Sequence, residues 1–196
     1  MIKFKYGTTN SGKSAEVLLK WWKNKDFLKV CLLKPSIDSR NGKYIYTRFG
    51  DQKVECNMIN ENDGIYNILQ SIDDGIPARQ YDLVIIDEAQ FLTNDQLNQI
   101  YEISSNVDSI TFLLYGLKTD FKGQLFSGTK RIFEIADEIS EIGPVKCWCG
   151  VNAKQNARID IDGNIITDGD IISIGYNYIP LCNKHFYLKN SGKTTN

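Results

Sequence analysis

The sequence predicts an α/β protein with a mainly parallel sheet flanked by helices, followed by a small β-rich module. Short apolar runs alternate with segments of helical periodicity over the first two-thirds of the chain. After Gly143-Pro144 this periodicity fades, and glycine, asparagine and cysteine become more frequent. We therefore expect a first domain at residues 1–143, a module at 144–189 and a disordered tail at 190–196.

Within the first domain, apolar runs predict the strands of the sheet, at residues 2–6, 29–33, 82–87 and 110–115. Pro35 is expected to halt the second run. Apolar residues at helical spacing predict helices at 13–25, at 63–72 and after Thr93-Asn94-Asp95-Gln96, which fits a capping box. Because the run at 82–87 is apolar on both faces, it belongs in a parallel sheet that helices cover on both sides.

Composition excludes several classes of protein. The net charge of −1 argues against a partner bound through a broad phosphate-neutralising surface, so no nucleic-acid partner is expected. The chain has no apolar run of about 18 residues to span a membrane and no apolar N-terminal segment of signal-peptide length. We therefore expect a cytoplasmic protein, in which the five cysteines are thiols or metal ligands rather than disulfides.

The clearest motif follows the first predicted strand and opens the first predicted helix. It matches G-x-x-x-x-G-K-[ST] and consists of Gly7, Thr8, Thr9, Asn10, Ser11, Gly12, Lys13 and Ser14. Such a loop wraps a phosphate with its backbone N–H groups at a helix N-terminus. Lys13 would reach the β- and γ-phosphates of ATP, and the Ser14 hydroxyl would coordinate Mg²⁺. The alternative is a glycine-rich turn before an ordinary helix.

Two acidic residues, Asp87 and Glu88, end the buried strand at 82–87. In parallel sheets ligands bind beyond the carboxyl ends of the strands, where the phosphate loop must also lie. Asp87 is the expected partner of Mg²⁺ opposite Ser14. Glu88 is the expected acceptor of a proton from a hydroxyl that receives phosphate, the alternative being a solvated acid that caps the next loop.

Three further segments make the pattern specific. They are Asp87-Glu88-Ala89-Gln90-Phe91, the stretch from Tyr115 to Phe126 with Gly116-Leu117 and Phe121, and Lys34-Pro35 followed by Asp38-Ser39-Arg40. With the N-terminal phosphate loop, they occur in the order seen in type II (cellular and bacterial) thymidine kinases, and the chain resembles this family over about 180 residues. The resemblance implies a P-loop (RecA-like) fold with a zinc-binding lasso domain, and transfer of the γ-phosphate of ATP to the 5′-hydroxyl of thymidine or deoxyuridine.

The resemblance also implies roles for particular residues. Glu88 would be the general base, while Gln90 and Arg40 would belong to the nucleotide site. The residues expected to surround or hydrogen-bond the base are Phe91, Leu117, Phe121, Asn156, Ile171, Ser173, Ile174, Gly175 and Tyr178. A homotetramer and feedback inhibition by thymidine triphosphate are implied as well.

A metal site is predicted from two ligand pairs, Cys147-Trp148-Cys149 and Cys182-Asn183-Lys184-His185, the latter containing the single histidine of the chain. Structural Zn²⁺ takes four such thiolate and imidazole ligands. The family's first pair is usually C-x-x-C, and the C-x-C spacing here displaces Cys147 by one residue. The shorter loop must bend more tightly to put both sulfurs on one metal, so the spacing leaves open whether Cys147 reaches the ion.

Two other functions fit parts of the sequence. Asp-Glu-Ala-Gln also resembles a motif of nucleic-acid-dependent ATPases, but such helicases need two domains of this kind and basic tracking surfaces. A zinc-ribbon binding module fused to an inert nucleotide-binding domain would not need Lys13, Ser14, Asp87 and Glu88 together. Release of ADP with thymidine, and then with single-stranded DNA, discriminates between the three.

Overall fold

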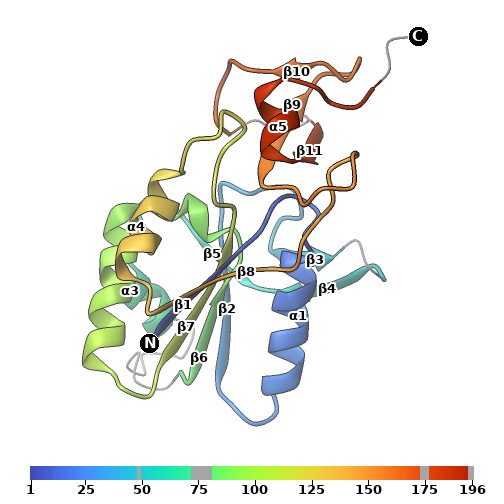
Figure 1. Ribbon diagram of the computed structural model, residues 1–196. Coiled ribbons are helices and arrows are strands. Elements are labelled where there is room, and N and C mark those ends of the chain that lie inside the picture. Colours follow the sequence, from blue (N-terminus) through green and yellow to red (C-terminus); the bar gives the residue numbers. More distant parts are fainter. Residues whose placement is uncertain (48–49, 72–80, 173–176, 194–196) are drawn as a thin grey trace.

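The structure is a computed structural model that describes residues 1–47, 50–71, 81–172 and 177–193. A six-stranded sheet forms its centre, in the order β5-β2-β6-β7-β1-β8, and every described pair of neighbouring strands in it is parallel (Figure 1). Its strands are β1 (Ile2–Tyr6), β2 (Val30–Pro35), β5 (Asn57–Ile59), β6 (Leu83–Ile86), β7 (Thr111–Gly116) and β8 (Glu138–Glu141). Because all six run the same way, their carboxyl ends meet at one edge of the sheet.

Helices cover both faces of the sheet, as predicted. On one face lie α1 (Lys13–Asn24) and the hairpin of β3 (Tyr44–Thr47) and β4 (Gln52–Glu55). On the other lie α2 (Ile65–Ser71), α3 (Asn94–Asn106) and α4 (Ser127–Ile135). The four buried residues of β6 point alternately into the two cores, since Leu83 and Ile85 pack with α1 and Val84 and Ile86 pack with the other helices.

The capping box predicted at Thr93 is confirmed and begins α3. The Gln96 N–H donates to Thr93 Oγ1 at 3.2 Å, and the Thr93 N–H donates to Gln96 Oε1 at 3.0 Å. The predicted end of the second strand is wrong, because β2 includes Pro35. Pairing with β6 stops at Leu33, so the missing N–H of Pro35 interrupts no ladder on that side. Of the helix expected at 63–72, α2 covers 65–71, and Ile72 lies outside the described residues.

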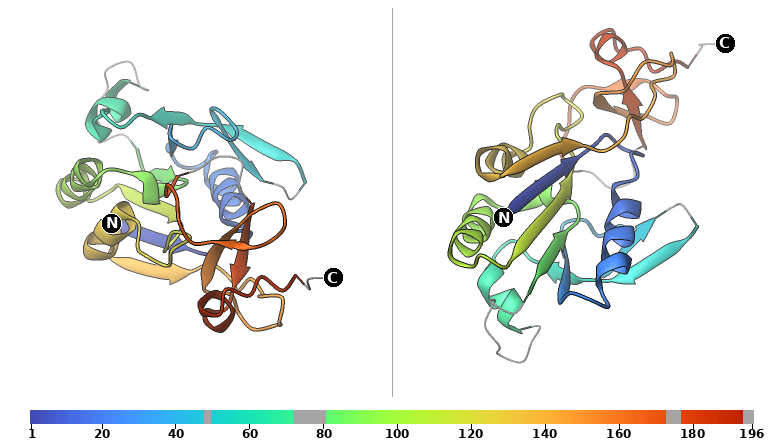
Figure 2. Two further views of the ribbon diagram at one scale, coloured as in Figure 1. Left: turned by 90° about the horizontal axis from the view of Figure 1, so that it is seen from above. Right: turned by 60° about the horizontal axis from the view of Figure 1, so that its bottom comes forward.

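The C-terminal module contains a three-stranded antiparallel sheet in the order β10-β9-β11, followed by one short helix. Its elements are β9 (Gln155–Ile159), β10 (Ile165–Ile166), β11 (Asn177–Leu181) and α5 (Asn183–Tyr187). The module lies beyond the carboxyl ends of the large sheet, as two further views show (Figure 2). This position places it next to the loops that follow β1, β6 and β7.

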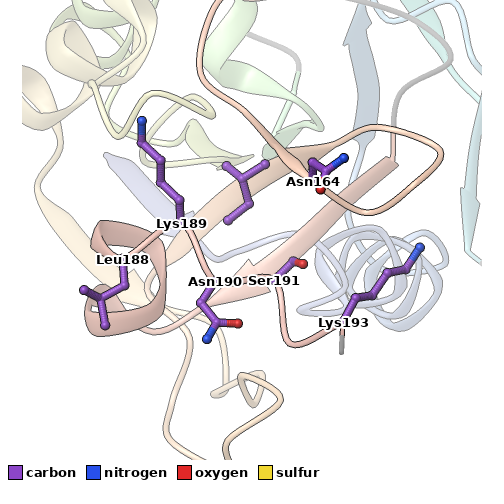
Figure 3. Close-up of a pocket in the computed structure, with 7 residues that line it drawn as sticks. Asn164, Leu188, Lys189, Asn190, Ser191 and Lys193 are labelled. Carbon is purple, nitrogen blue, oxygen red and sulfur yellow. The ribbon is translucent and has the colours of Figure 1, made fainter. Parts of the chain in front are cut away.

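Part of the expected tail contacts this module. The Asn190 N–H donates to the carbonyl of His185 at 2.9 Å, and the Trp148 indole N–H donates to the carbonyl of Asn190 at 3.3 Å. Residues between 164 and 193 line a shallow pocket there (Figure 3). Its described lining comes from the module and from residues 190–193 of the expected tail, and includes none of the phosphate loop. Among the described residues, no helix is both long and apolar enough to cross a membrane.

Candidate active site and metal centre

The phosphate loop joins β1 to α1. Its backbone takes conformations and close contacts that favour glycine or asparagine at particular positions. Gly12 and Asn10 have φ angles of 82° and 63°, in the left-handed region where a glycine or asparagine costs least. A Cβ on Gly7 would lie 2.3 Å from Ser11 Oγ, so a side chain there would displace Ser11. Ser11 Oγ is buried without a hydrogen-bond partner among the described residues. An unpaired polar atom in a loop at a helix N-terminus fits a phosphate oxygen.

Lys13 is buried and folds back over this loop. Its ammonium donates to the carbonyl oxygens of Thr8 at 2.9 Å and Gly7 at 3.4 Å. Burial lowers the pKa of Lys13, and the nearby charges of Glu88 and Asp87 oppose that shift. The ammonium of Lys13 thus lies beside the phosphate loop and is held there by two backbone carbonyls.

Ser14 and Asp87 meet as the sequence predicts. The Ser14 hydroxyl, in the first turn of α1, donates to Asp87 Oδ2 at 3.0 Å across the carboxyl edge of the sheet. Burial, together with the charge of Glu88, raises the pKa of Asp87 to about 7. A hydroxyl and a carboxylate held together beside a phosphate loop are the oxygen donors that Mg²⁺ takes.

Glu88 is nearly buried and has φ 54°, a left-handed conformation that is unusual for a glutamate. Its Oε1 accepts from Arg40 Nη2 at 3.0 Å, and its Oε2 accepts from the Gln90 amide at 2.6 Å. The Gln90 Oε1 in turn accepts from the N–H of Leu117 at 3.0 Å. Gln90 thus holds Glu88 against the loop after β7, and none of these bonds involves the phosphate loop.

Arg40 is shared between two carboxylates. Its Nε donates to Asp38 Oδ1 at 2.5 Å, and the same guanidinium pairs with Glu88. Burial alone would raise the pKa of Asp38, but the hydrogen bonds and charge of Arg40 outweigh it and lower that pKa. The segment from Lys34 to Arg40 therefore supplies a cation that orients the carboxylate of Glu88.

The residues expected around a base lie on loops of the first domain and on the C-terminal module. The ring of Phe91 packs edge-on against Phe126, with centroids 5.6 Å apart. Phe121 is buried in the loop after β7, which starts at Leu117. Tyr178 lies on β11 and Ile171 lies before it. Ser173, Ile174 and Gly175 lie outside the described residues.

Asn156, on β9, bridges the module to the first domain. Its Oδ1 accepts from the N–H of Thr9 in the phosphate loop at 2.7 Å, and its Nδ2 donates to the carbonyl of Thr119 at 3.3 Å. The neighbouring Gln155 also bonds to Thr119, through the hydroxyl, at 3.1 Å. A residue predicted to lie near the base thus contacts the backbone of the phosphate loop.

The four predicted metal ligands converge. The Sγ and imidazole nitrogen atoms of Cys147, Cys149, Cys182 and His185 all lie within 4.8 Å of one another. His185 Nδ1 lies 3.4 Å from Cys147 Sγ and 3.3 Å from Cys182 Sγ, and the sulfurs of Cys149 and Cys182 are 3.9 Å apart. Tetrahedral Zn²⁺, with Zn–S of about 2.3 Å and Zn–N of about 2.0 Å, spaces its ligand atoms roughly 3.5–3.8 Å apart. This donor set therefore fits structural Zn²⁺.

Cys147 belongs to the cluster despite the C-x-C spacing. Cys147 is buried against His185, whereas Cys149 is the exposed member of the pair. A tight turn makes this possible, because the Gly150 N–H donates to the Cys147 carbonyl at 2.8 Å and Gly150 has φ 84°. A glycine tolerates that conformation, so the shortened spacing still brings both sulfurs to one point.

One further buried residue at the junction of the module with the first domain was not predicted from the sequence. Arg158 is buried on β9, against Phe121 and Tyr178. A lone arginine in a polar stretch normally indicates a solvated surface. The one available signal was its position two residues after Asn156, which puts the two side chains on the same face of a strand.

A parallel sheet with this phosphate loop after its first strand, and an acidic pair after a buried strand, defines a P-loop nucleotide-binding protein. Residues 1–186 match the model of the thymidine kinase family, and the chain belongs to that family. It phosphorylates thymidine.

Relatives of known name agree over nearly the whole chain. The thymidine kinase of Legionella pneumophila strain Lens is 36% identical over 198 residues, covering 98% of this chain and 92% of the relative. Those of Lactococcus lactis and Enterobacteria phage T4 are also each 36% identical, covering 95% and 93% of this chain and 96% and 93% of the relatives. The three sources show that the similarity is spread over bacteria and a phage.

Proposed function

We propose that the chain transfers the γ-phosphate of ATP to the 5′-hydroxyl of thymidine, with Glu88 as the general base. The observation that carries this assignment is the position of Glu88, one residue after the carboxylate that bonds to Ser14. Arg40 and Gln90 each engage one of its oxygens. A carboxylate fixed in this way is available to a hydroxyl that lies in line with the phosphate loop.

In the proposed reaction, the loop at residues 7–14 holds the triphosphate at the N-terminus of α1, and Lys13 moves from the carbonyls of Thr8 and Gly7 to the β- and γ-phosphates. The thymidine 5′-oxygen attacks the γ-phosphorus. The bond between the γ-phosphorus and the β–γ bridging oxygen breaks, and ADP leaves. The hydroxyl proton passes to Glu88. Mg²⁺ held by Ser14 and Asp87 would neutralise charge on the phosphates.

Base recognition is proposed to rest on the backbone of residues 171–178, with Phe91, Leu117, Phe121 and Tyr178 around the ring. Thymine presents acceptor, donor and acceptor at O2, N3 and O4, whereas cytosine presents acceptor, acceptor and donor. Backbone groups cannot exchange donor for acceptor, so deoxycytidine would leave buried groups unpaired, and such sites discriminate by about 10⁴ or more. Deoxyuridine keeps the thymine pattern and should be a substrate.

Three finer assignments go with this function. Zn²⁺ would be a structural ion, because all four positions are filled by protein ligands and none is left for a substrate. The protein would act as a homotetramer in the cytoplasm, and thymidine triphosphate would inhibit it by occupying the same site. Sedimentation tests the homotetramer, and inhibition kinetics with varied thymidine test the inhibition by thymidine triphosphate.

A panel of nucleosides assayed for ADP release with ATP and Mg²⁺ tests the proposed function. Thymidine and deoxyuridine should be turned over, and deoxycytidine and deoxyadenosine should be essentially inert. A deoxycytidine kcat/KM within tenfold of that for thymidine would eliminate the backbone readout. Stimulation of ADP release by single-stranded DNA, without thymidine, would instead support a nucleic-acid-dependent ATPase.

A further inference from the structure

Arg158 is a buried cation that the reaction proposed above does not use. It is 1% exposed and is the largest side chain among the fully buried ones in the described part of the chain. It lies on β9, two residues after Asn156, which contacts the phosphate loop. Arginine is almost never buried to this extent unless its donors are satisfied by fixed partners.

The partners of Arg158 lie at both ends of one segment. Its Nη2 donates to the carbonyl oxygens of Asp170 at 2.7 Å and Ile171 at 3.0 Å. Its Nε donates to the hydroxyl of Tyr178 at 3.0 Å. Residues 171–178 are the backbone proposed to read the edge of the base. One side chain therefore holds the first and last residues of that segment at fixed separations.

The face of the same guanidinium contacts two aromatic rings. Arg158 Cζ lies 3.7 Å from the ring centroid of Phe121 and 5.4 Å from that of Tyr178. Phe121 belongs to the loop after β7 of the first domain, whereas Tyr178 belongs to the module. A planar guanidinium stacks on aromatic faces while its edge donates hydrogen bonds, which an ammonium cannot do in the same way.

We propose that Arg158 is a positioning residue for the nucleoside base. Acting through its partners, it sets the spacing between Phe121 and Tyr178 and the orientation of the backbone at Asp170 and Ile171. This inference rests on the proposed function, since it assigns Arg158 to the pocket that function requires. Arg158 should control affinity for the nucleoside and the choice between bases, and have little effect on ATP.

A purely structural role makes a different prediction. The module has a small core, with Cys147, Ala157, Leu181 and Cys182 as its buried apolar members among the described residues. If Arg158 only stabilised this core, its loss would lower zinc content and the melting temperature, and would weaken nucleoside and ATP together. A selective change in nucleoside kinetics would not follow.

The test uses the full-length, zinc-loaded protein and the variants Arg158→Met and Arg158→Lys. Methionine keeps length and apolar packing without donors, and lysine keeps the charge without the planar fork. Arg131→Met is the matched control, because Arg131 lies on α4 and pairs on the surface with Glu134 and Asn98. KM and kcat for thymidine, KM for ATP, the kcat/KM ratio of thymidine to deoxycytidine, and zinc per chain are measured for each.

Both Arg158 variants should raise KM for thymidine by about tenfold or more and lower the thymidine-to-deoxycytidine ratio by at least as much, since three charge-assisted hydrogen bonds are lost or reduced. KM for ATP should stay within twofold, with about one zinc per chain. Arg131→Met should match the wild type. A thymidine KM within twofold of wild type, or a parallel loss of ATP affinity and zinc, would overturn the proposal.

Tyr178→Phe decides the question if the Arg158 variants fail to fold. It keeps the ring and removes only the hydroxyl that accepts from Arg158. A severalfold rise in the thymidine KM with a lower base ratio supports the proposal, and an unchanged base ratio refutes it. Wild-type protein that binds ATP but phosphorylates no thymidine would reject the proposed function itself, and the role of Arg158 would fall with it.

Discussion

Replacing Glu88 by glutamine separates its role in proton transfer from its role in the fold. The two side chains have the same shape, but the amide has one accepting oxygen where the carboxylate has two. Arg40 and Gln90 both donate to Glu88, so in the variant one of these donors meets an NH₂ group. The change therefore has a structural cost as well as a chemical one, and their sizes can be compared.

The structural cost should be small. The side chain of Arg40 is 56% exposed, so water screens its pair with Glu88 and the loss is about 1 kcal/mol. For a protein of this size, that lowers the melting temperature by about 2–4 °C. Loss of a general base lowers kcat by about 10²–10⁴, which corresponds to roughly 3–5 kcal/mol in the barrier. The chemical effect should therefore dominate.

The measurements are kcat for thymidine at saturating ATP, Kd for ATP, and the melting temperature. Glu88→Gln should lose at least a hundredfold in kcat, with ATP affinity within about threefold of wild type because the phosphate loop is untouched. Glu134→Gln is the matched control, since it also removes a carboxylate that pairs with an arginine, on the surface of α4. A Glu88→Gln protein that keeps more than half of the wild-type kcat would remove Glu88 from the role of base.

Three further predictions concern the loop, the acidic pair and the metal. Lys13→Ala should weaken ATP binding and lower kcat by at least tenfold, measured by calorimetry and steady-state kinetics; unchanged values would make residues 7–14 a structural turn. Because burial raises the folded-state pKa of Asp87 to about 7, its stabilising contribution is present at low pH and lost as pH rises through that value. Asp87→Asn should therefore raise the melting temperature of nucleotide-free protein by several degrees at pH 8 and less at pH 5; an equal change at both would contradict this. Purified protein should contain about one zinc per chain. Cys147→Ser should lower the zinc content at least as much as Cys149→Ser, since Cys147 is the buried ligand of the pair. Elemental analysis checks both predictions.

The sequence predicted the parts of the fold that carry a strong local pattern. The phosphate loop, the doubly apolar strand β6 and the capping box at Thr93 each combine residue type with a fixed spacing, and each lies where expected. The first strand and α1 flank the loop, so they follow from it. These elements alone place Lys13 and Asp87 at one edge of the sheet.

Short or polar elements could not be predicted in the same way. All four residues of β8 are exposed, and β5 has only three residues, so neither shows an apolar run. Helix α4 was missed because Ser-Gly-Thr at its start reads as a turn. Gly128 is required there because a Cβ would lie 2.6 Å from the carbonyl oxygen of Gln90, a contact between distant segments.

The sequence predicted which residues form the candidate site better than it predicted the hydrogen bonds and packing contacts between them. Asp87, Ser14 and the four zinc ligands meet as expected, because motif spacing determines them. The bond from Gln90 to Glu88 and the burial of Arg158 depend on which loops pack together in three dimensions. No spacing in the sequence encodes such pairings.

The bond between Asn156 and the Thr9 amide has a consequence for recombination between related genes. A crossover near residue 143 would look safe, because the periodicity of the chain changes there and the large sheet is already complete. Yet it would join the nucleotide loop of one parent to the β9 side chain of another, and a mismatched residue at 156 would leave that amide without its acceptor. Chimeras made at this point should keep the ATP affinity of the loop's parent only where the residue at 156 supplies an acceptor for the amide of residue 9.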